Sequence, residues 1–133
     1  MADLPLTGGC NCGTVRFEVS EPLVSASYCH CTRCQRRTGT AAAATAKIAP
    51  GSLRWVSGED RIRIWWPPDG YGKAFCTECG SHLFSRAPGD EPDVGLRLGV
   101  FDGDPGIRPS ARHHTATAAV WEPIPDDGLP RRP

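Results

Sequence analysis

The chain has 133 residues, of which 15 are acidic, 15 are basic and 39% are hydrophobic. This length suits one soluble domain that buries roughly 65–70% of its unfolded surface. A formal net charge of zero provides no general attraction to nucleic acid or to an anionic membrane, so we expect no partner of either kind.

The first seven residues have neither the basic flank nor the apolar core of a secretory signal. The longest run of small apolar residues, 41–49, is interrupted by Thr45 and Lys47 and is too short to span a bilayer. We therefore expect a cytoplasmic protein whose thiols stay reduced. The chain has 7 cysteines. Because this number is odd, they cannot all pair as disulfides, and metal ligation is the favoured role.

Glycines and prolines are frequent, 15 and 13 respectively, which favours short strands and turns over long helices. Val15, Phe17 and Val19 alternate with polar residues, which predicts a strand with one buried face. Residues 23–28 are expected to form a second strand that leads into the central cysteines. For residues 40–47, alanine propensity favours a helix. The flanking threonines and the Pro-Gly turn that follows favour an extended segment, and we predict a strand.

Residues 53–56 and 61–66 are predicted to pair as a hairpin through a turn at 57–60. The clearest alternation lies at 94–100, which predicts another strand, and residues 113–119 are expected to form the last one. Residues 126–133 are expected to form a flexible tail. These patterns together predict one mostly β domain over residues 1–133, built from short antiparallel strands around the cysteines.

The cysteines occur in three groups: Cys10-x-Cys12, Cys29-His30-Cys31-x-x-Cys34 and Cys76-x-x-Cys79. A C-x-x-C turn places two thiolates on one ion and cannot complete a tetrahedron alone. Two divisions are open. In one, the two outer pairs form a closed four-thiolate site and the central triplet forms an open site. In the other, the last two cysteines of the triplet join the final pair as a zinc ribbon, which needs a long loop and leaves three cysteines unused. We favour the first division, a choice to which the family resemblance below also contributes.

A closed metal site stabilises a fold, whereas an open site can accept an outside ligand. A zinc ion with three thiolates has a formal charge of about −1, which disfavours hydrolysis and suits exchange of a thiolate in the fourth position. Arg33, Arg36 and Arg37 follow the triplet and are candidates for binding substrate carboxylates. The alternative is that they form a solvated surface. His30 is expected to point away from the ion and to pack or hydrogen-bond.

The order of these motifs resembles one known family. The segments that carry the resemblance are Gly9-Cys10-x-Cys12-Gly13-x-Val15-Arg16-Phe17, Cys29-His30-Cys31-x-x-Cys34-x-Arg36-x-x-Gly39 and Phe75-Cys76-x-x-Cys79-Gly80-Ser81-x-Leu83. They are similar to the glutathione-dependent formaldehyde-activating enzyme family, which also includes centromere protein V. Residues 98–102 and 121–124 extend the resemblance, which thus covers most of the chain. Members often carry a histidine where Arg112 aligns, and His113 is displaced from that position by one residue.

The resemblance implies a β-tent fold with two zinc ions. It implies a structural zinc on the residues that match the first and last pairs: Cys10, Cys12, Cys76 and Cys79. It implies a catalytic zinc on the middle triplet: Cys29, Cys31 and Cys34. The family activity joins formaldehyde to glutathione as S-(hydroxymethyl)glutathione and is a carbon–sulfur lyase activity. The implied partner is therefore a small-molecule thiol or a thiol–aldehyde adduct.

Three functional hypotheses follow. The first is a carbon–sulfur lyase that acts at the open zinc site, and the second is a non-catalytic zinc module that binds a partner. The third, a redox sensor, would require the triplet to lose its metal on oxidation. The balanced charge argues against a module that binds nucleic acid, and we favour the enzyme.

Overall fold

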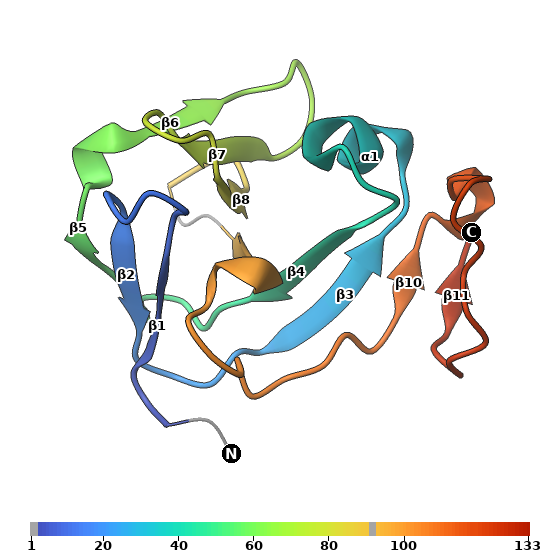
Figure 1. Ribbon diagram of the computed structural model, residues 1–133, viewed down its shortest axis with the longest axis horizontal. Coiled ribbons are helices and arrows are strands. Elements are labelled where there is room, and N and C mark those ends of the chain that lie inside the picture. Colours follow the sequence, from blue (N-terminus) through green and yellow to red (C-terminus); the bar gives the residue numbers. More distant parts are fainter. Residues whose placement is uncertain (1–2, 91–92) are drawn as a thin grey trace.

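Short strands joined by turns make up most of the chain, as a computed structural model that describes residues 3–90 and 93–133 shows (Figure 1). The first strands and the helix are β1 (Leu6–Gly9), β2 (Arg16–Val19), β3 (Ser25–Cys29), α1 (Thr32–Thr38), β4 (Ala43–Lys47) and β5 (Leu53–Ser57). The later strands are β6 (Ile62–Trp65), β7 (Gly72–Cys76), β8 (His82–Arg86), β9 (Val94–Arg97), β10 (Arg112–His113) and β11 (Arg131–Arg132). Short 3-10 helices occupy Glu59–Arg61, Leu98–Val100 and Thr115–Thr117. The predicted mostly β fold is confirmed.

The strands form two sheets. The smaller has the order β1-β2-β5 and is antiparallel, and the larger has the order β11-β10-β3-β4-β9-β8-β7-β6. In the larger sheet β10 runs parallel to both β3 and β11, so the expectation of antiparallel strands holds for the other pairs only. In Figure 1 the smaller sheet stands to one side and the larger sheet curves from β6 round to β11.

Hydrophobic side chains from both sheets form one core. Phe17 of β2 is almost fully buried, and Leu83 of β8 and Leu96 of β9 are completely buried. Trp55 of β5 bridges the sheets, with its ring centroid 6.0 Å from that of Phe17 and 5.7 Å from that of Phe84. The period-two alternation that predicted a strand at Val15–Val19 therefore reflects a face that packs on the second sheet. This packing fixes the strand ends that carry the cysteines.

The predicted hairpin of 53–56 with 61–66 is wrong. β5 pairs with β2 in the smaller sheet, and β6 pairs with β7 in the larger one. The segment between them contains the 3-10 helix Glu59–Arg61 and redirects the chain from one sheet to the other. The strand predicted at 40–47 is confirmed as β4, because it lies between β3 and β9 and pairs with both.

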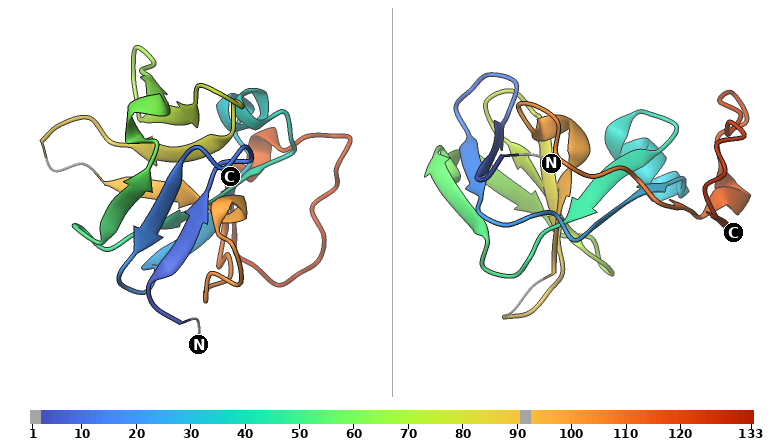
Figure 2. Two further views of the ribbon diagram at one scale, coloured as in Figure 1. Left: turned by 60° about the vertical axis from the view of Figure 1, so that its left-hand side comes forward. Right: turned by 90° about the horizontal axis from the view of Figure 1, so that it is seen from below.

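The C-terminal part of the chain follows a different course from the one expected. The last strand predicted at 113–119 is reduced to β10, because His114 adopts a left-handed backbone conformation with φ of 56° and a 3-10 helix follows. The segment 126–133, expected to be a tail, returns along β10 and pairs with it as β11. Figure 2 shows this segment at the edge of the larger sheet. In the residues that the structure describes, no helix has the length and apolar character needed to cross a membrane.

Candidate metal centres

Four cysteine sulfurs meet where the two sheets come together. Cys10 and Cys12 lie in the turn between β1 and β2, Cys76 ends β7, and Cys79 lies in the turn before β8. Their Sγ atoms all lie within 4.8 Å of one another. Cys10 Sγ is 3.5 Å from Cys12 Sγ, which in turn is 3.9 Å from Cys76 Sγ. A Zn–S bond of about 2.3 Å gives a tetrahedral S···S separation of about 3.8 Å, so this cluster has the spacing of a closed zinc site.

Polar groups around these four sulfurs stabilise negative charge on them. The backbone N–H of Val15 donates to Cys10 Sγ at 3.2 Å. The Ser81 hydroxyl lies 3.2 Å from Cys79 Sγ and lowers the pKa of that thiol to about 5. Burial instead raises the pKa of Cys76 to about 11. A buried thiol of this kind ionises readily only beside a cation, which is what a bound metal provides.

The other three sulfurs meet at the opposite end of the larger sheet. Cys29 ends β3, Cys31 is the N-cap of α1, and Cys34 lies in the first turn of that helix. Their Sγ atoms also lie within 4.8 Å of one another. The sulfurs thus group as four and three, and the zinc-ribbon division, which joins Cys31 and Cys34 with the last pair, is not the arrangement in the structure. We expect the triplet to hold an ion with one position left for another ligand.

The helix α1 explains the spacing of the triplet. Cys31 Sγ accepts a hydrogen bond from the backbone N–H of Cys34 at 3.2 Å, in the manner of a polar N-cap side chain. At the other end Gly39, with φ of 70°, closes the helix. This helix could not be predicted from the sequence, because its seven residues are too few to show a periodic pattern.

The triplet holds negative charge collectively. The pKa of Cys29 is lowered to about 5, first because the Cys34 thiol donates a hydrogen bond to it, and further through the Cys31 backbone and the charge of His114. The pKa of Cys34 is raised, first by the same contact with Cys29 and then by burial. Three thiols this close cannot all ionise unless a cation offsets their repulsion. The donor set therefore fits zinc, which prefers thiolate ligands.

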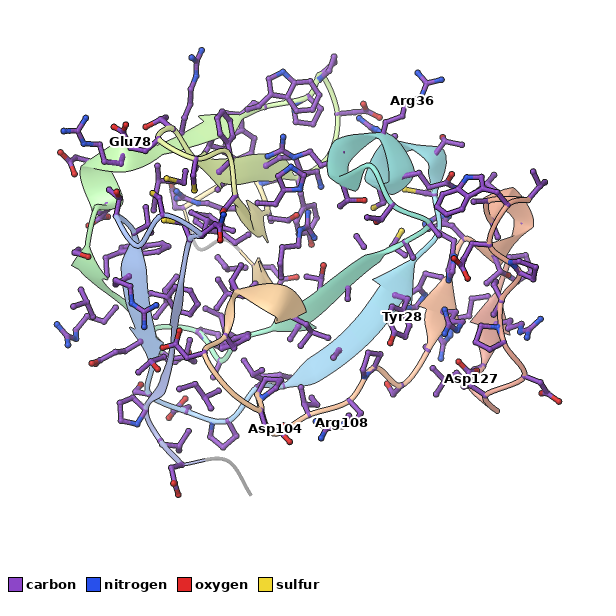
Figure 3. The ribbon with its side chains drawn as sticks, in the orientation of Figure 1. Tyr28, Arg36, Glu78, Asp104, Arg108 and Asp127 are labelled. Atoms are coloured by element: carbon purple, nitrogen blue, oxygen red, sulfur yellow. The ribbon has the colours of Figure 1, made fainter. Side chains whose placement is uncertain are left out.

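A cleft with a volume of about 860 Å³ opens beside Cys31 and Cys34. The three arginines predicted from the sequence as substrate contacts all line this cleft, but their surroundings differ. Arg33 donates to the Asp69 carboxylate at 3.1 Å. Arg36 is exposed and points away from the body of the molecule (Figure 3). The Arg37 guanidinium lies 5.3 Å from the centre of the Phe75 ring.

Sequence reasoning missed other residues that line the same cleft. They come from β6, β7, β9 and the segment after β10, and include Trp65, Lys73, Phe75, Arg97 and His114. Lys73 and Phe75 could have been linked to the cleft only through their position just before the Cys76 motif. Arg97 was visible only as one polar member of an alternating strand. For His114 the adjacent pair of histidines gave the one hint, and its left-handed backbone directs it toward the cleft.

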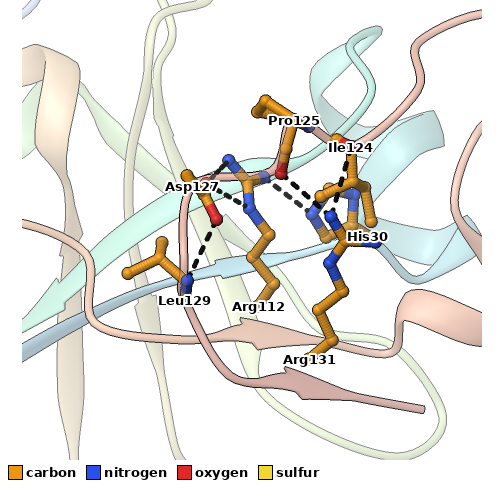
Figure 4. A network of polar contacts seen from close by, with 7 residues as sticks. All are labelled: His30, Arg112, Ile124, Pro125, Asp127, Leu129 and Arg131. Carbon is orange, nitrogen blue, oxygen red and sulfur yellow. Dashed lines mark hydrogen bonds and ion pairs between the residues drawn. The ribbon is translucent and has the colours of Figure 1, made fainter.

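The side chain of His30, which lies between Cys29 and Cys31, is linked through Arg112 to Asp127 of the C-terminal segment (Figure 4). His30 is buried, and its Nε2 accepts a hydrogen bond from Arg112 Nη1 at 3.1 Å. Burial and the Arg112 charge lower the pKa of His30. Arg112 also lies over the Tyr28 ring at 4.3 Å and donates to Asp127 Oδ2 at 2.8 Å. His30 therefore packs and hydrogen-bonds, as expected, and does not join the cysteine triplet.

Comparisons with known proteins show which proteins this chain resembles. The family model described as "Glutathione-dependent formaldehyde-activating enzyme" matches residues 5–117. A crystal structure of a protein from Rhodobacter sphaeroides is 27% identical and superposes with a TM-score of 0.59, over 73% of this chain and 88% of that chain. A comparison with curated proteins finds no match.

Proposed function

The chain belongs to the family of glutathione-dependent formaldehyde-activating enzymes, and we propose on that premise that it is a carbon–sulfur lyase that acts on a thiol or a thiol–aldehyde adduct. The reaction would take place at Cys29, Cys31 and Cys34, which would hold a catalytic zinc ion. Cys10, Cys12, Cys76 and Cys79 hold a structural zinc ion. A reducing cytoplasm suits a chain whose seven cysteines form no disulfide.

One observation carries this proposal above the others. The three-sulfur cluster opens onto a cleft large enough for a small molecule, whereas the four-sulfur cluster has a complete tetrahedral ligand set. A closed site has no place for a substrate, and an open one beside a cleft does. A zinc ion held by the triplet would supply a position for the substrate sulfur and stabilise negative charge that develops on the aldehyde oxygen.

The residues of the chain provide the geometry. In the synthetic direction the thiol sulfur bonds to the aldehyde carbon, the carbon–oxygen π bond breaks, and the thiol proton ends on the new hydroxyl group. The reverse reaction releases the aldehyde. The cleft holds the thiol and the aldehyde next to each other, which lowers the entropic part of the barrier. The candidate substrate contacts are Arg33, Arg36 and Arg37, whose guanidinium groups can pair with carboxylates.

Cobalt(II) substitution tests the open position directly. We expect addition of 2-sulfanylethanol to the cobalt-loaded protein to change the visible absorption of one of two bound ions, because a thiol enters the fourth position. Ethylene glycol, which lacks sulfur, serves as the control ligand. The change should vanish in Cys31→Ser. With ¹³C-formaldehyde, exchange between the free aldehyde and its thiol adduct should be faster in the presence of the zinc-loaded protein.

An unchanged absorption spectrum at saturating thiol would contradict the proposal. The chain would then be a non-catalytic zinc module, since neither metal site would accept an outside sulfur ligand.

A further inference from the structure

The cleft beside the cysteine triplet concentrates positive charge that the chain as a whole lacks. Of the residues that the structure describes, six lysines and arginines line it, against the single carboxylate of Asp69. Asp69 pairs with Arg33. Within residues 3–90 and 93–133, the other five cationic side chains of the cleft form no ion pair: Arg36, Arg37, Arg63, Lys73 and Arg97. Such a cleft attracts an anion.

The strand register places the inner cations together on one face of the larger sheet. Lys73 of β7 pairs with Ser85 of β8, Ser85 pairs with Gly95 of β9, and Arg97 lies two residues beyond Gly95. Residues two apart on a strand share a face. Ser85 Oγ accepts hydrogen bonds from Arg97 Nη2 at 2.9 Å and Lys73 Nζ at 3.4 Å. Arg37 reaches the same cleft from α1.

This arrangement is electrostatically unfavourable in the absence of an anion. The pKa of Lys73 is lowered by burial and by the nearby charge of Arg97. The pKa of Arg97 is lowered by burial and by the charge of Arg37, against the opposing effect of the Cys34 thiolate. Three thiolates around a zinc ion leave a formal charge of about −1, too little to balance three cations. An additional negative group is needed to offset the remaining positive charge.

Unused hydrogen-bond donors point to the same conclusion. The Nε and Nη2 atoms of Arg37 and the Nε atom of Arg97 are buried and have no hydrogen-bond partner among the described residues. A buried donor without an acceptor is costly. A carboxylate has two oxygens that can accept from several guanidinium and ammonium donors at once.

An apolar wall lies next to these cations. Trp65 of β6 is the register partner of Lys73, and Arg63 is the partner of Phe75, so aromatic and cationic side chains alternate on this face. Trp65 remains 54% exposed although it lines the cleft. An exposed indole beside half-buried positive charge suits a ligand with an apolar body as well as an anionic group.

We propose, on the premise of the thiol chemistry above, that the substrate is a thiol or thiol adduct with a carboxylate and an apolar body. Arg37, Lys73 and Arg97 bind the carboxylate, and Trp65 and Phe75 pack against the body. These residues determine specificity and make or break no bond. The triplet binds the sulfur.

The probe for this proposal is 3-phenyl-2-sulfanylpropanoate, compared with its neutral methyl ester and with 2-sulfanylpropanoate, which lacks the ring. Titration calorimetry with the zinc-loaded full chain measures Kd. We expect the acid to bind the wild type about tenfold or more tightly than the ester, because charge-assisted hydrogen bonds contribute roughly 1.5–3 kcal/mol. We expect 2-sulfanylpropanoate, which lacks the ring, to bind the wild type more weakly than 3-phenyl-2-sulfanylpropanoate does.

Three variants locate the effect. Arg37→Gln and Lys73→Gln should each weaken binding of the acid and leave Kd for the ester unchanged. Arg54→Gln serves as the matched control, because Arg54 is exposed on β5 and pairs with Glu18, away from the cleft. Equal affinity of the wild type for acid and ester would overturn the proposed carboxylate site and leave thiol binding intact. Absence of binding by every thiol would overturn both proposals.

Discussion

At the scale of single residues, Gly8 shows how tightly the region before the first cysteine pair is built. A Cβ atom on Gly8 would lie 2.3 Å from the Val100 backbone oxygen and 2.6 Å from Cζ of Phe17. Phe17 is 1% exposed and cannot move aside. Gly8→Ala should therefore lower the free energy of unfolding by about 2 kcal/mol or more, as overpacking does.

Urea denaturation of the zinc-loaded protein measures this effect. The control is Gly103→Ala, because a Cβ atom there meets no heavy atom within 4 Å. If the two variants denature at the same urea concentration, the prediction is wrong, and the close contacts of Gly8 do not make an added Cβ atom destabilising.

Some residues of the candidate site could be predicted from the sequence and others could not. The cysteines were visible because ligands of one ion recur at short, local spacings, and the structure groups them as four and three. Lys73 and Arg97 could not be assigned to the cleft, because they are 24 positions apart in the numbering and meet only through the pairing of β7, β8 and β9. A charged residue in an alternating strand carries no sign of which neighbour it will face.

At the scale of elements, strands were predictable and their partners were not. The period-two pattern identified β2 and β9, although residues 98–100 of the strand predicted at 94–100 form a 3-10 helix. The neighbouring threonines and turn identified β4. Their neighbours depend on contacts between distant segments, and for that reason the expected hairpin between β5 and β6 was wrong. The pairing of β10 with β11 could not be predicted either, because each strand has only two residues.

The contact between Arg112 and Asp127 gives a prediction about these small elements. Asp127→Asn should weaken the hold of the C-terminal segment on β10, because it removes the charged acceptor of two Arg112 hydrogen bonds. The Arg112 backbone N–H donates to the Pro130 carbonyl at 2.9 Å. Hydrogen exchange at that amide should become faster, while exchange in β2 stays unchanged.

Low pH should have the same effect as this substitution. The hydrogen bonds from Arg112 hold the pKa of Asp127 below its usual value. A carboxyl group with a lowered pKa in the folded state stabilises that state above its unfolded pKa of about 3.9, and the contribution is lost as the pH falls through the lowered value. Asp126→Asn is the control, since Asp126 is exposed and forms no ion pair among the described residues. Equal exchange in both variants would show that Arg112 does not hold the segment.

At the scale of the whole molecule, the two cysteine clusters differ in what they connect. The four-cysteine cluster joins the β1–β2 turn of the smaller sheet to the β7–β8 turn of the larger one. The triplet lies at the end of β3 and the start of α1, so its residues are close in the chain before any metal binds. Closing a short local loop costs less entropy than joining distant segments, so the first cluster should contribute more to stability.

Cys79→Ser and Cys34→Ser test this difference with the same chemical change. Cys79 is exposed, so its replacement removes a ligand without leaving a cavity. Each variant should lose one of two bound zinc ions, counted by elemental analysis. Cys79→Ser should also lower Tm by at least about 10 °C, because structural zinc can contribute roughly 10–16 kcal/mol, as much as the net stability of a domain. Cys34→Ser should change Tm by only a few degrees, roughly the effect of 1 kcal/mol. Equal Tm values for the two variants would contradict the assignment of one structural and one reactive centre.

Chelation of both ions should unfold the wild type.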